Sequence, residues 1–118
     1  MAMSQVMIAL GSNWQQALHI AWASQRLSAI LDNVRFSRKL WTEDIHGTGI
    51  FYMNRLVAGT TTLSPEALQQ VLKTIEADLE RSRHRVTIDL DLMLYDQERY
   101  HERDWLRPYI QRLIPDIL

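Results

Sequence analysis

The chain has 118 residues, a formal net charge of −1 and no cysteine. This length allows one domain with a substantial core but is short for two, so we expect a single domain over residues 1–118. The near-neutral charge gives no electrostatic reason to expect nucleic acid or an anionic membrane as a partner. The lack of cysteine excludes disulfides, thiolate metal ligands and a thiol nucleophile. No apolar stretch could span a membrane, and residues 1–5 lack the basic region of a signal peptide, so we expect a cytoplasmic protein.

The first part of the chain predicts a strand followed by a helix. Residues 6–10 form a continuous apolar run, which is typical of a strand buried on both faces, and turn residues follow it. Apolar positions then recur at helical spacing over residues 14–31 and give one core-facing stripe. We expect Ser12 or Asn13 to cap this helix. His19 lies off the stripe, so we expect a solvated side chain rather than a ligand.

The middle of the chain predicts two strands and a second helix. Residues 34–42 alternate as a strand does, residues 43–49 carry two glycines and form a loop, and residues 50–63 form a long strand. Gly59 within that strand indicates a bulge or a close approach of backbone. Ser64 and Pro65 then start a helix as N-cap and first helical residue, and its core stripe continues to about residue 81.

Two aspartates on one face of the last predicted strand are the strongest functional signal. Apolar and polar side chains alternate over residues 87–95, so Asp89 and Asp91 lie side by side, about 6–7 Å apart by strand geometry. Aspartate is rare in strands and two on one face repel each other. Mg²⁺ bound together with substrate phosphates would relieve that repulsion. The alternative is a solvated strand face that happens to be acidic. The core-facing positions of this strand are predicted to be Ile88, Leu90, Leu92 and Leu94.

Three arginines precede this strand. Arg81, Arg83 and Arg85 could supply the guanidinium groups that bind phosphates. Alternatively, they favour the negative end of the preceding helix dipole. Their combination with the aspartate pair favours a nucleotide-phosphate site.

The order of the elements predicts the fold. Strand, helix, strand, strand, helix and strand form a ferredoxin-like α+β arrangement, an antiparallel sheet with both helices on one face. The other face is left open for a site. After the last strand we expect a polar loop over residues 96–103. A short amphipathic helix or irregular cover then follows over residues 105–113, ended by Pro115.

Five motifs occur in order along the chain: residues 8–13 (IALGSN), 51–54 (FYMN), 63–68 (LSPEAL), 75–76 (IE) and 87–95 (TIDLDLMLY). Together they resemble the 6-hydroxymethyl-7,8-dihydropterin pyrophosphokinase family. The resemblance covers a core over residues 6–95 and leaves residues 96–118 as a divergent C-terminal tail. It implies Mg-dependent transfer of pyrophosphate from ATP to a pterin hydroxymethyl group in folate biosynthesis.

The resemblance also implies site residues. Asp89 and Asp91 are expected to hold two Mg²⁺ ions. Arg81, Arg83 and Arg85 are expected to contact the transferring phosphates as catalytic groups. The other positions that the resemblance assigns are Gly11, Thr42, Ile45, Tyr52 and Asn54 at the pterin, and Glu76 and Leu92, together with Arg81 and Arg83, at ATP.

Departures from the family pattern leave a second hypothesis open. Glu43 and Asp44 stand where the family has two prolines, and the loop before the aspartates lacks a tryptophan, a glycine, a proline and one arginine. The family's Pro-His segment has no clean counterpart, for which His101 or Arg103 could substitute. The protein is therefore either a working enzyme with a minimal loop or a non-catalytic domain that binds nucleotide or pterin. A third hypothesis is phosphotransfer to another acceptor.

Overall fold

The computed structural model describes residues 2–44, 46–79 and 86–118. Its elements are, in chain order, β1 (Ser4–Ser12), α1 (Gln16–Ile30), β2 (Asp32–Phe36), β3 (Leu40–Glu43), β4 (Phe51–Thr61), α2 (Pro65–Asp78), β5 (Asp89–Tyr95), β6 (Glu98–Arg99), α3 (Glu102–Trp105), α4 (Pro108–Leu113) and the 3₁₀ turn η1 (Ile114–Asp116). None of the helices in the described ranges has the length and apolar character that crossing a membrane requires.

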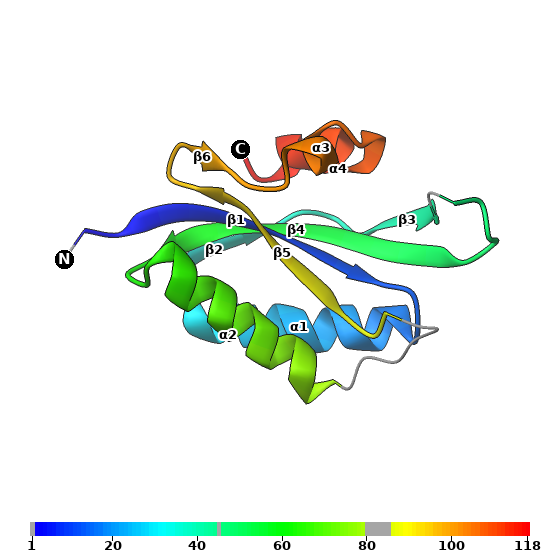
Figure 1. Ribbon diagram of the computed structural model, residues 1–118, viewed down its shortest axis with the longest axis horizontal. Helices are drawn as coiled ribbons and strands as arrows, with labels where there is room; N and C mark the ends of the chain where they lie inside the picture. The colour runs from blue at the N-terminus through cyan, green and yellow to red at the C-terminus, as the bar shows by residue number, and fades with distance from the viewer. Residues whose placement is uncertain (1, 45, 80–85) are drawn as a thin grey trace.

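The strands form one antiparallel sheet in the order β2-β4-β1-β5-β6, and β3 pairs with β4 beside β2. Helices α1 and α2 lie together on one side of this sheet (Figure 1). This is the predicted α+β arrangement with ferredoxin-like topology. Strands β1 and β5 lie far apart in the sequence but are hydrogen-bonded neighbours in the middle of this sheet, which brings distant parts of the chain together.

The main core lies between the sheet and the two helices. Amphipathic spacing turns one stripe of each helix inward. The fully buried helical side chains of this core are Ile20, Ala23 and Leu27 of α1 and Leu68, Leu72 and Ile75 of α2. Helix α2 begins as predicted, because Ser64 accepts a hydrogen bond from the Ala67 amide and Pro65 occupies the first turn.

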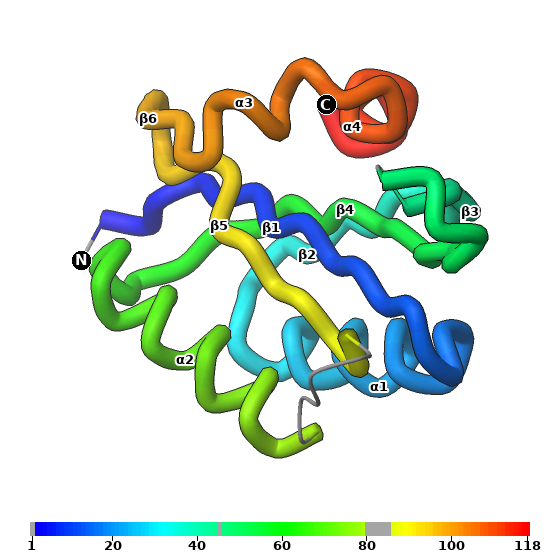
Figure 2. Tube along the Cα trace, turned by 45° about the vertical axis from the view of Figure 1, so that its right-hand side comes forward, coloured from blue at the N-terminus to red at the C-terminus, as the bar shows by residue number. Residues whose placement is uncertain are grey.

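A second core covers part of the sheet face that was predicted to be open. Helices α3 and α4 lie on the side of the sheet opposite α1 and α2 (Figure 1), and α4 lies near the β3–β4 hairpin (Figure 2). Together with strand side chains they bury a separate apolar cluster, made of Met7, Leu56, Ala58, Met93, Trp105, Ile110, Leu113 and Ile117. The C-terminal tail therefore covers this part of the sheet face, and only the part outside the cluster stays open.

The C-terminal region also differs from the prediction in its elements. Residues 96–103 are not simply a loop, because β6 returns to pair with the end of β5 and α3 starts at Glu102. Trp105 anchors this region, since its indole Nε1 donates to the carbonyl oxygens of Tyr100 (3.1 Å) and Met93 (3.3 Å). The helix predicted over residues 105–113 is shorter, because Pro108 provides its first turn.

A bulge in β5 overturns one predicted core position. Met7 of β1 pairs with Leu94, whereas the next residue, Ile8, pairs with Leu92, so Met93 is an extra residue in β5. The bulge shifts the alternation by one position. As a result Leu94 packs against the second cluster rather than under the helices, and Tyr95 takes the helix-side position.

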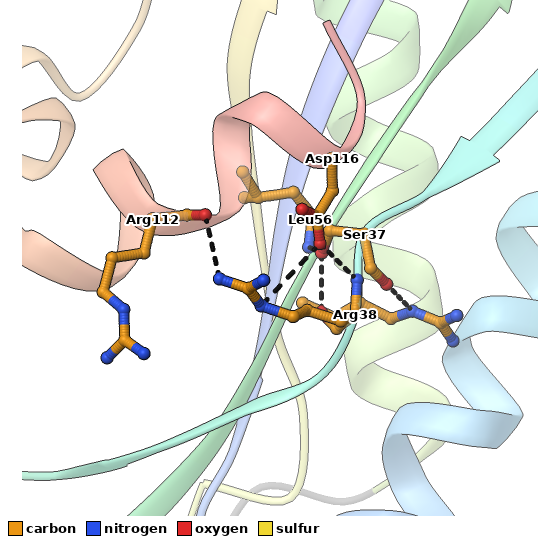
Figure 3. A network of polar contacts seen from close by, with 6 residues as sticks. Ser37, Arg38, Leu56, Arg112 and Asp116 are labelled. Atoms are coloured by element: carbon orange, nitrogen blue, oxygen red, sulfur yellow. Dashed lines mark hydrogen bonds and ion pairs between the residues drawn. The ribbon is translucent and has the colours of Figure 1, made fainter.

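The single strand predicted over residues 34–42 is divided into β2 and β3. Ser37 lies at the break and still pairs with β4, because its amide donates to the Leu56 carbonyl and its hydroxyl accepts from the Leu56 amide (Figure 3). Arg38 instead binds the tail. Its amide donates to the Asp116 carboxylate at 2.9 Å and its guanidinium donates to the Arg112 carbonyl at 3.3 Å (Figure 3). Arg38, at the break between β2 and β3, thus attaches the C-terminal tail to the sheet.

Two predictions at the start of α1 are wrong. Neither Ser12 nor Asn13 caps the helix, because both bind the segment that leads into β5. The Ser12 hydroxyl donates to the Thr87 carbonyl at 2.6 Å, and the Asn13 side-chain oxygen accepts from the Val86 amide at 2.6 Å. His19 is buried rather than solvated, since its ring stacks on Trp14 and its Nδ1 lies 2.8 Å from the Trp14 carbonyl oxygen.

The glycine within β4 makes the predicted close approach and gives a stability test. A Cβ on Gly59 would lie 2.9 Å from the Asp32 carbonyl oxygen and 3.3 Å from the Leu31 Cβ. Gly59→Ala should therefore lower the free energy of unfolding by about 1–3 kcal/mol, as overpacking against backbone does. Urea denaturation measures this. Gly11→Ala is the matched control, because its Cβ would meet nothing closer than 3.5 Å, and an equal loss in both variants would contradict the explanation.

Candidate active site

The floor of the site is a row of residues across three strands. Gly11 of β1 is paired with Asn54 of β4 on one side and with Asp89 of β5 on the other. Directly paired residues of an antiparallel sheet project from the same face, so Asn54 and Asp89 flank the glycine. A Cβ at Gly11 would lie 3.5 Å from the Asn54 side-chain oxygen, which is an ordinary contact. Glycine is therefore not required by the protein's own packing, and it leaves the floor flat.

Asp89 and Asp91 lie side by side on this face, as predicted from their spacing. Both are partly buried, whereas the intervening Leu90 and the following Leu92 belong to the helix-side core. Asp91 is paired with Ala9 of β1, one step along the floor from Gly11. The aspartates thus project into the region that the second core leaves uncovered.

A pocket of about 310 Å³ stands over this floor. Its walls come from the end of β3 and the loop after it on one side and from the C-terminal tail on the other. The residues that line it are Ala9, Leu10, Gly11, Thr42, Glu43, Asp44, His46, Tyr52, Asn54, Asp89, Asp91, Asp104, Arg107 and Tyr109. The predicted site residues Gly11, Thr42, Tyr52, Asn54, Asp89 and Asp91 are therefore brought to one pocket.

The amide of Asn54 is held in a fixed orientation. Asn54 is 5% exposed, and its Nδ2 donates to the Thr42 hydroxyl at 2.7 Å and to the Leu40 carbonyl at 3.3 Å. The side-chain oxygen is left on the side of Gly11. The Tyr52 hydroxyl accepts a 3.3 Å hydrogen bond from Asn13. These contacts pre-organise a hydrogen-bond acceptor and an aromatic ring at one end of the pocket.

Two predicted nucleotide residues do not line this pocket. The Leu92 side chain is buried in the helix-side core. The Glu76 carboxylate accepts a 2.7 Å hydrogen bond from the Leu90 amide, which places it at the outer edge of β5. In this position Glu76 satisfies a backbone donor of the strand that carries both aspartates. The predicted residues Ile45, Arg81, Arg83 and Arg85 lie outside the described residues.

The sequence reasoning missed the contribution of the tail. Asp104, Arg107 and Tyr109 line the pocket, and Arg107 Nε lies 3.0 Å from a carboxylate oxygen of Asp104. The amphipathic pattern of residues 105–113 is the signal that this segment packs against the rest of the protein, with its apolar side chains buried and its polar side chains outside that core. Of the two substitutes suggested for the family's missing segment, His101 has its Nε2 3.8 Å from an Asp91 oxygen. Arg103 is exposed and does not line the pocket.

Negative charge dominates the described lining, with five carboxylates (Glu43, Asp44, Asp89, Asp91 and Asp104) beside Arg107 and His46. This field acts on Tyr109. Burial raises the pKa of the Tyr109 phenol, Asp104 raises it further and Arg107 opposes the rise, while Asp91 and Asp89 add to it. The pKa of the Tyr109 phenol therefore depends on charges of the tail and on those of the aspartate pair.

The donor set fits a magnesium ion that is shared with a substrate. Within the described ranges no group of three or more histidine, cysteine or acidic side chains is arranged to enclose a metal ion. Two neighbouring carboxylates on an open floor match Mg²⁺, which is held by one or two carboxylates plus phosphate oxygens and water. The arrangement does not match the closed four-ligand sites typical of structural zinc.

The raised pKa of Tyr109 gives a pH test. Folding favours the neutral phenol, so its contribution to stability is present below the ordinary tyrosine pKa of about 10 and is lost as the pH rises through the higher folded value. The free energy of unfolding should therefore fall above about pH 10, and more steeply in the wild type than in Tyr109→Phe. Denaturant unfolding at stepped pH, with tyrosinate absorbance, measures both. Identical pH profiles for the two proteins would refute the assigned environment.

Comparison with known proteins agrees with this geometry. Residues 7–117 match the family model described as 7,8-dihydro-6-hydroxymethylpterin-pyrophosphokinase (HPPK). A folate synthesis bifunctional protein of Arabidopsis thaliana is 30% identical over 130 residues, covering 97% of this chain and 27% of that protein. A second one from the same plant, described as mitochondrial, is 33% identical over 129 residues, covering 97% of this chain and 23% of that protein.

The chain thus spans about a quarter of the length of these relatives. One of them is described as mitochondrial, so the cytoplasmic location stays a prediction. The family match, by contrast, extends over almost the whole chain, including the tail. The protein belongs to the 7,8-dihydro-6-hydroxymethylpterin-pyrophosphokinase family.

Proposed function

We propose that this chain transfers pyrophosphate from ATP to the hydroxymethyl group of 6-hydroxymethyl-7,8-dihydropterin, a step of folate biosynthesis. The observation that carries the proposal is the juxtaposition of Asp89 and Asp91 with Gly11 and Asn54 on one pocket floor. Such a reaction needs acidic metal ligands next to a flat surface that can form hydrogen bonds with a planar ring. Family membership and the folate-synthesis relatives support the same reaction.

At the phosphate end, Asp89 and Asp91 would hold Mg²⁺, and we propose two ions. The metal, when bound, would neutralise the charge of the ATP phosphates and hold them in line for displacement. The bound metal would also relieve the repulsion between the two carboxylates. Arg81, Arg83 and Arg85 are further phosphate ligands in this proposal, on the basis of the sequence alone.

At the pterin end, Gly11 would let the ring lie against β1. The buried Asn54 side-chain oxygen is an oriented acceptor for ring N–H groups, because its Nδ2 is already held by Thr42. Tyr52 would stack on the ring or contact its edge from the same strand. Thr42 and Ile45 would complete this end of the pocket.

The reaction forms a bond between the pterin hydroxymethyl oxygen and the β-phosphorus of ATP. The bond from that phosphorus to the oxygen bridging the α- and β-phosphates breaks, and AMP departs with its electron pair. The hydroxyl proton is released to solvent or to an acceptor in the site. Such transfers depend mainly on positioning and charge neutralisation. The protein's task is therefore to hold two substrates over one floor.

A non-catalytic binding domain is the competing proposal. Glu43 and Asp44 line the pocket, and their charge disfavours uncompensated phosphate close by. A protein that keeps the pocket but lacks rapid closure would bind nucleotide or pterin without turnover. The two proposals are separated by measuring binding and AMP formation on the same preparation.

The aspartate pair gives the decisive variant. Asp89→Asn/Asp91→Asn should lower AMP release from ATP, Mg²⁺ and hydroxymethyldihydropterin by at least about 100-fold, because charge stabilisation at the phosphates is lost. The variant should still fold, since asparagine has nearly the size and shape of aspartate and the mutual repulsion of the two carboxylates is removed.

Glu98→Gln/Glu102→Gln is the matched control, because both acids are exposed and lie outside the pocket. Its turnover should equal that of the wild type. Nucleotide binding by the wild type without AMP above the background of the aspartate variant would reject the enzyme in favour of the binding domain.

The pterin end is tested by filling the floor. Gly11→Val should fold, because a Cβ at this position has ordinary contacts and valine suits a strand. Its branched side chain would occupy the space over β1, so the Kd for pterin should rise more than about tenfold, as a steric block worth over 1.4 kcal/mol does. The Kd for Mg-nucleotide should change less. Isothermal titration measures both constants, and unchanged pterin affinity would place the ring elsewhere.

A further inference from the structure

We infer that Arg107, held by Asp104, is a phosphate-binding residue that the C-terminal tail contributes to this pocket. The inference rests on the proposed function and extends it to a residue outside the motifs that carry the family resemblance. Arg107 is the one arginine or lysine among the described residues that line the pocket. The same lining carries five carboxylates, so a positively charged side chain among them favours the binding of an anionic ligand.

The backbone that carries Arg107 is firmly anchored. Its carbonyl oxygen accepts from the amides of Ile110 (3.1 Å) and Gln111 (3.2 Å), which starts α4. The Gln111 side chain donates back to the carbonyl of Trp105. Trp105 and Ile110 are buried in the second core. The position of Arg107 over the pocket is therefore fixed by the same packing that attaches the tail to the sheet.

The side chain is restrained as well. Asp104 accepts a 3.0 Å hydrogen bond from Arg107 Nε, and the two side chains are 31% and 35% exposed. Within the described ranges this is the hydrogen bond that the guanidinium makes, and it uses one nitrogen of three. The two Nη groups form a planar fork whose geometry matches two oxygens of one phosphate. Asp104 is thus a positioning residue for that fork.

Arg107 also lines the same pocket as the aspartate pair. His101, six residues before Arg107 on the same tail, has its Nε2 3.8 Å from an Asp91 oxygen, and Tyr109 lines the same pocket. A ligand that reaches the metal held by Asp89 and Asp91 therefore comes near Arg107. The triphosphate of ATP is the part of either proposed substrate that carries negative charge, so it is the group we assign to this guanidinium.

The test compares substitutions of two arginines on the same tail. Arg107→Gln removes the charge from the pocket, and Arg107→Lys keeps a charge but lacks the fork. Arg112→Gln is the matched control, because Arg112 is exposed and outside the lining. Titration calorimetry with the Mg²⁺ complex of α,β-methylene-ATP, and separately with hydroxymethyldihydropterin, gives the dissociation constants. Thermal unfolding verifies that each variant is folded.

Arg107→Gln should raise the Kd for the nucleotide analogue at least about tenfold, as loss of a charge-assisted hydrogen bond does. Its pterin Kd should stay within about twofold of the wild type, because this cation does not contact the ring. The nucleotide Kd of Arg107→Lys should lie between those of the wild type and Arg107→Gln, and the nucleotide Kd of Arg112→Gln should match the wild type. Competition by tripolyphosphate alone, weakened in the same order, would assign the contact to the phosphates rather than to the adenosine.

Equal nucleotide affinity in Arg107→Gln and Arg112→Gln would overturn this inference. If Asp89→Asn/Asp91→Asn still abolished turnover in that case, the proposed function would stand without it. A pterin affinity that falls while nucleotide affinity holds would equally reject the phosphate assignment. A wild type that binds no Mg-nucleotide would overturn both the inference and the proposed function.

Discussion

The hydrogen-bonded registers on the two sides of β1 are the constraint on which the site depends. One register places Asn54 beside Gly11, and the other places Asp89 beside the same residue. Since side chains alternate between faces, a slip of one residue in either pairing would turn the acceptor or the metal ligands into the helix-side core. The bulge at Met93 lies beyond the aspartates, so it redirects the end of β5 without disturbing this row. Both ends of the proposed reaction are thus set by one strand.

The C-terminal tail is the second determinant, because it converts an open sheet face into a pocket. Its apolar side chains bury Met7, Leu56 and Met93, and Arg38 binds it at Asp116 and Arg112. The same attachment presents Asp104, Arg107 and Tyr109 to the aspartates. A tail that was predicted to be a cover is therefore also a wall of the site. This explains how a chain without the family's Pro-His segment can still surround a ligand on two sides.

Much of the fold follows from local chemistry in the sequence. The alternation in residues 87–95 predicted which face Asp89 and Asp91 occupy, and Ser64 with Pro65 predicted where α2 begins. The errors arise where tertiary contacts override local pattern. Ser12 and Asn13 have the chemistry of caps, but the segment entering β5 competes for them. His19 was expected to be solvated because it lies off the apolar stripe, but Trp14 precedes α1 and stacks on its ring. Arg107 and Tyr109 line the pocket because of how the tail folds back. The amphipathic pattern indicates that one side of the tail is buried, but it does not indicate which part of the sheet that side covers.

The central claim is that Asp89 and Asp91 hold the catalytic metal on the open floor of the sheet. The most direct measurement is paramagnetic broadening of amide resonances by Mn²⁺, added in place of Mg²⁺ with α,β-methylene-ATP. Broadening should be strongest at Gly11, Asp89 and Asp91, weak on the outer faces of α1 and α2, and absent in Asp89→Asn/Asp91→Asn. Broadening centred away from β1 and β5, or equally strong in the double variant, would contradict the account.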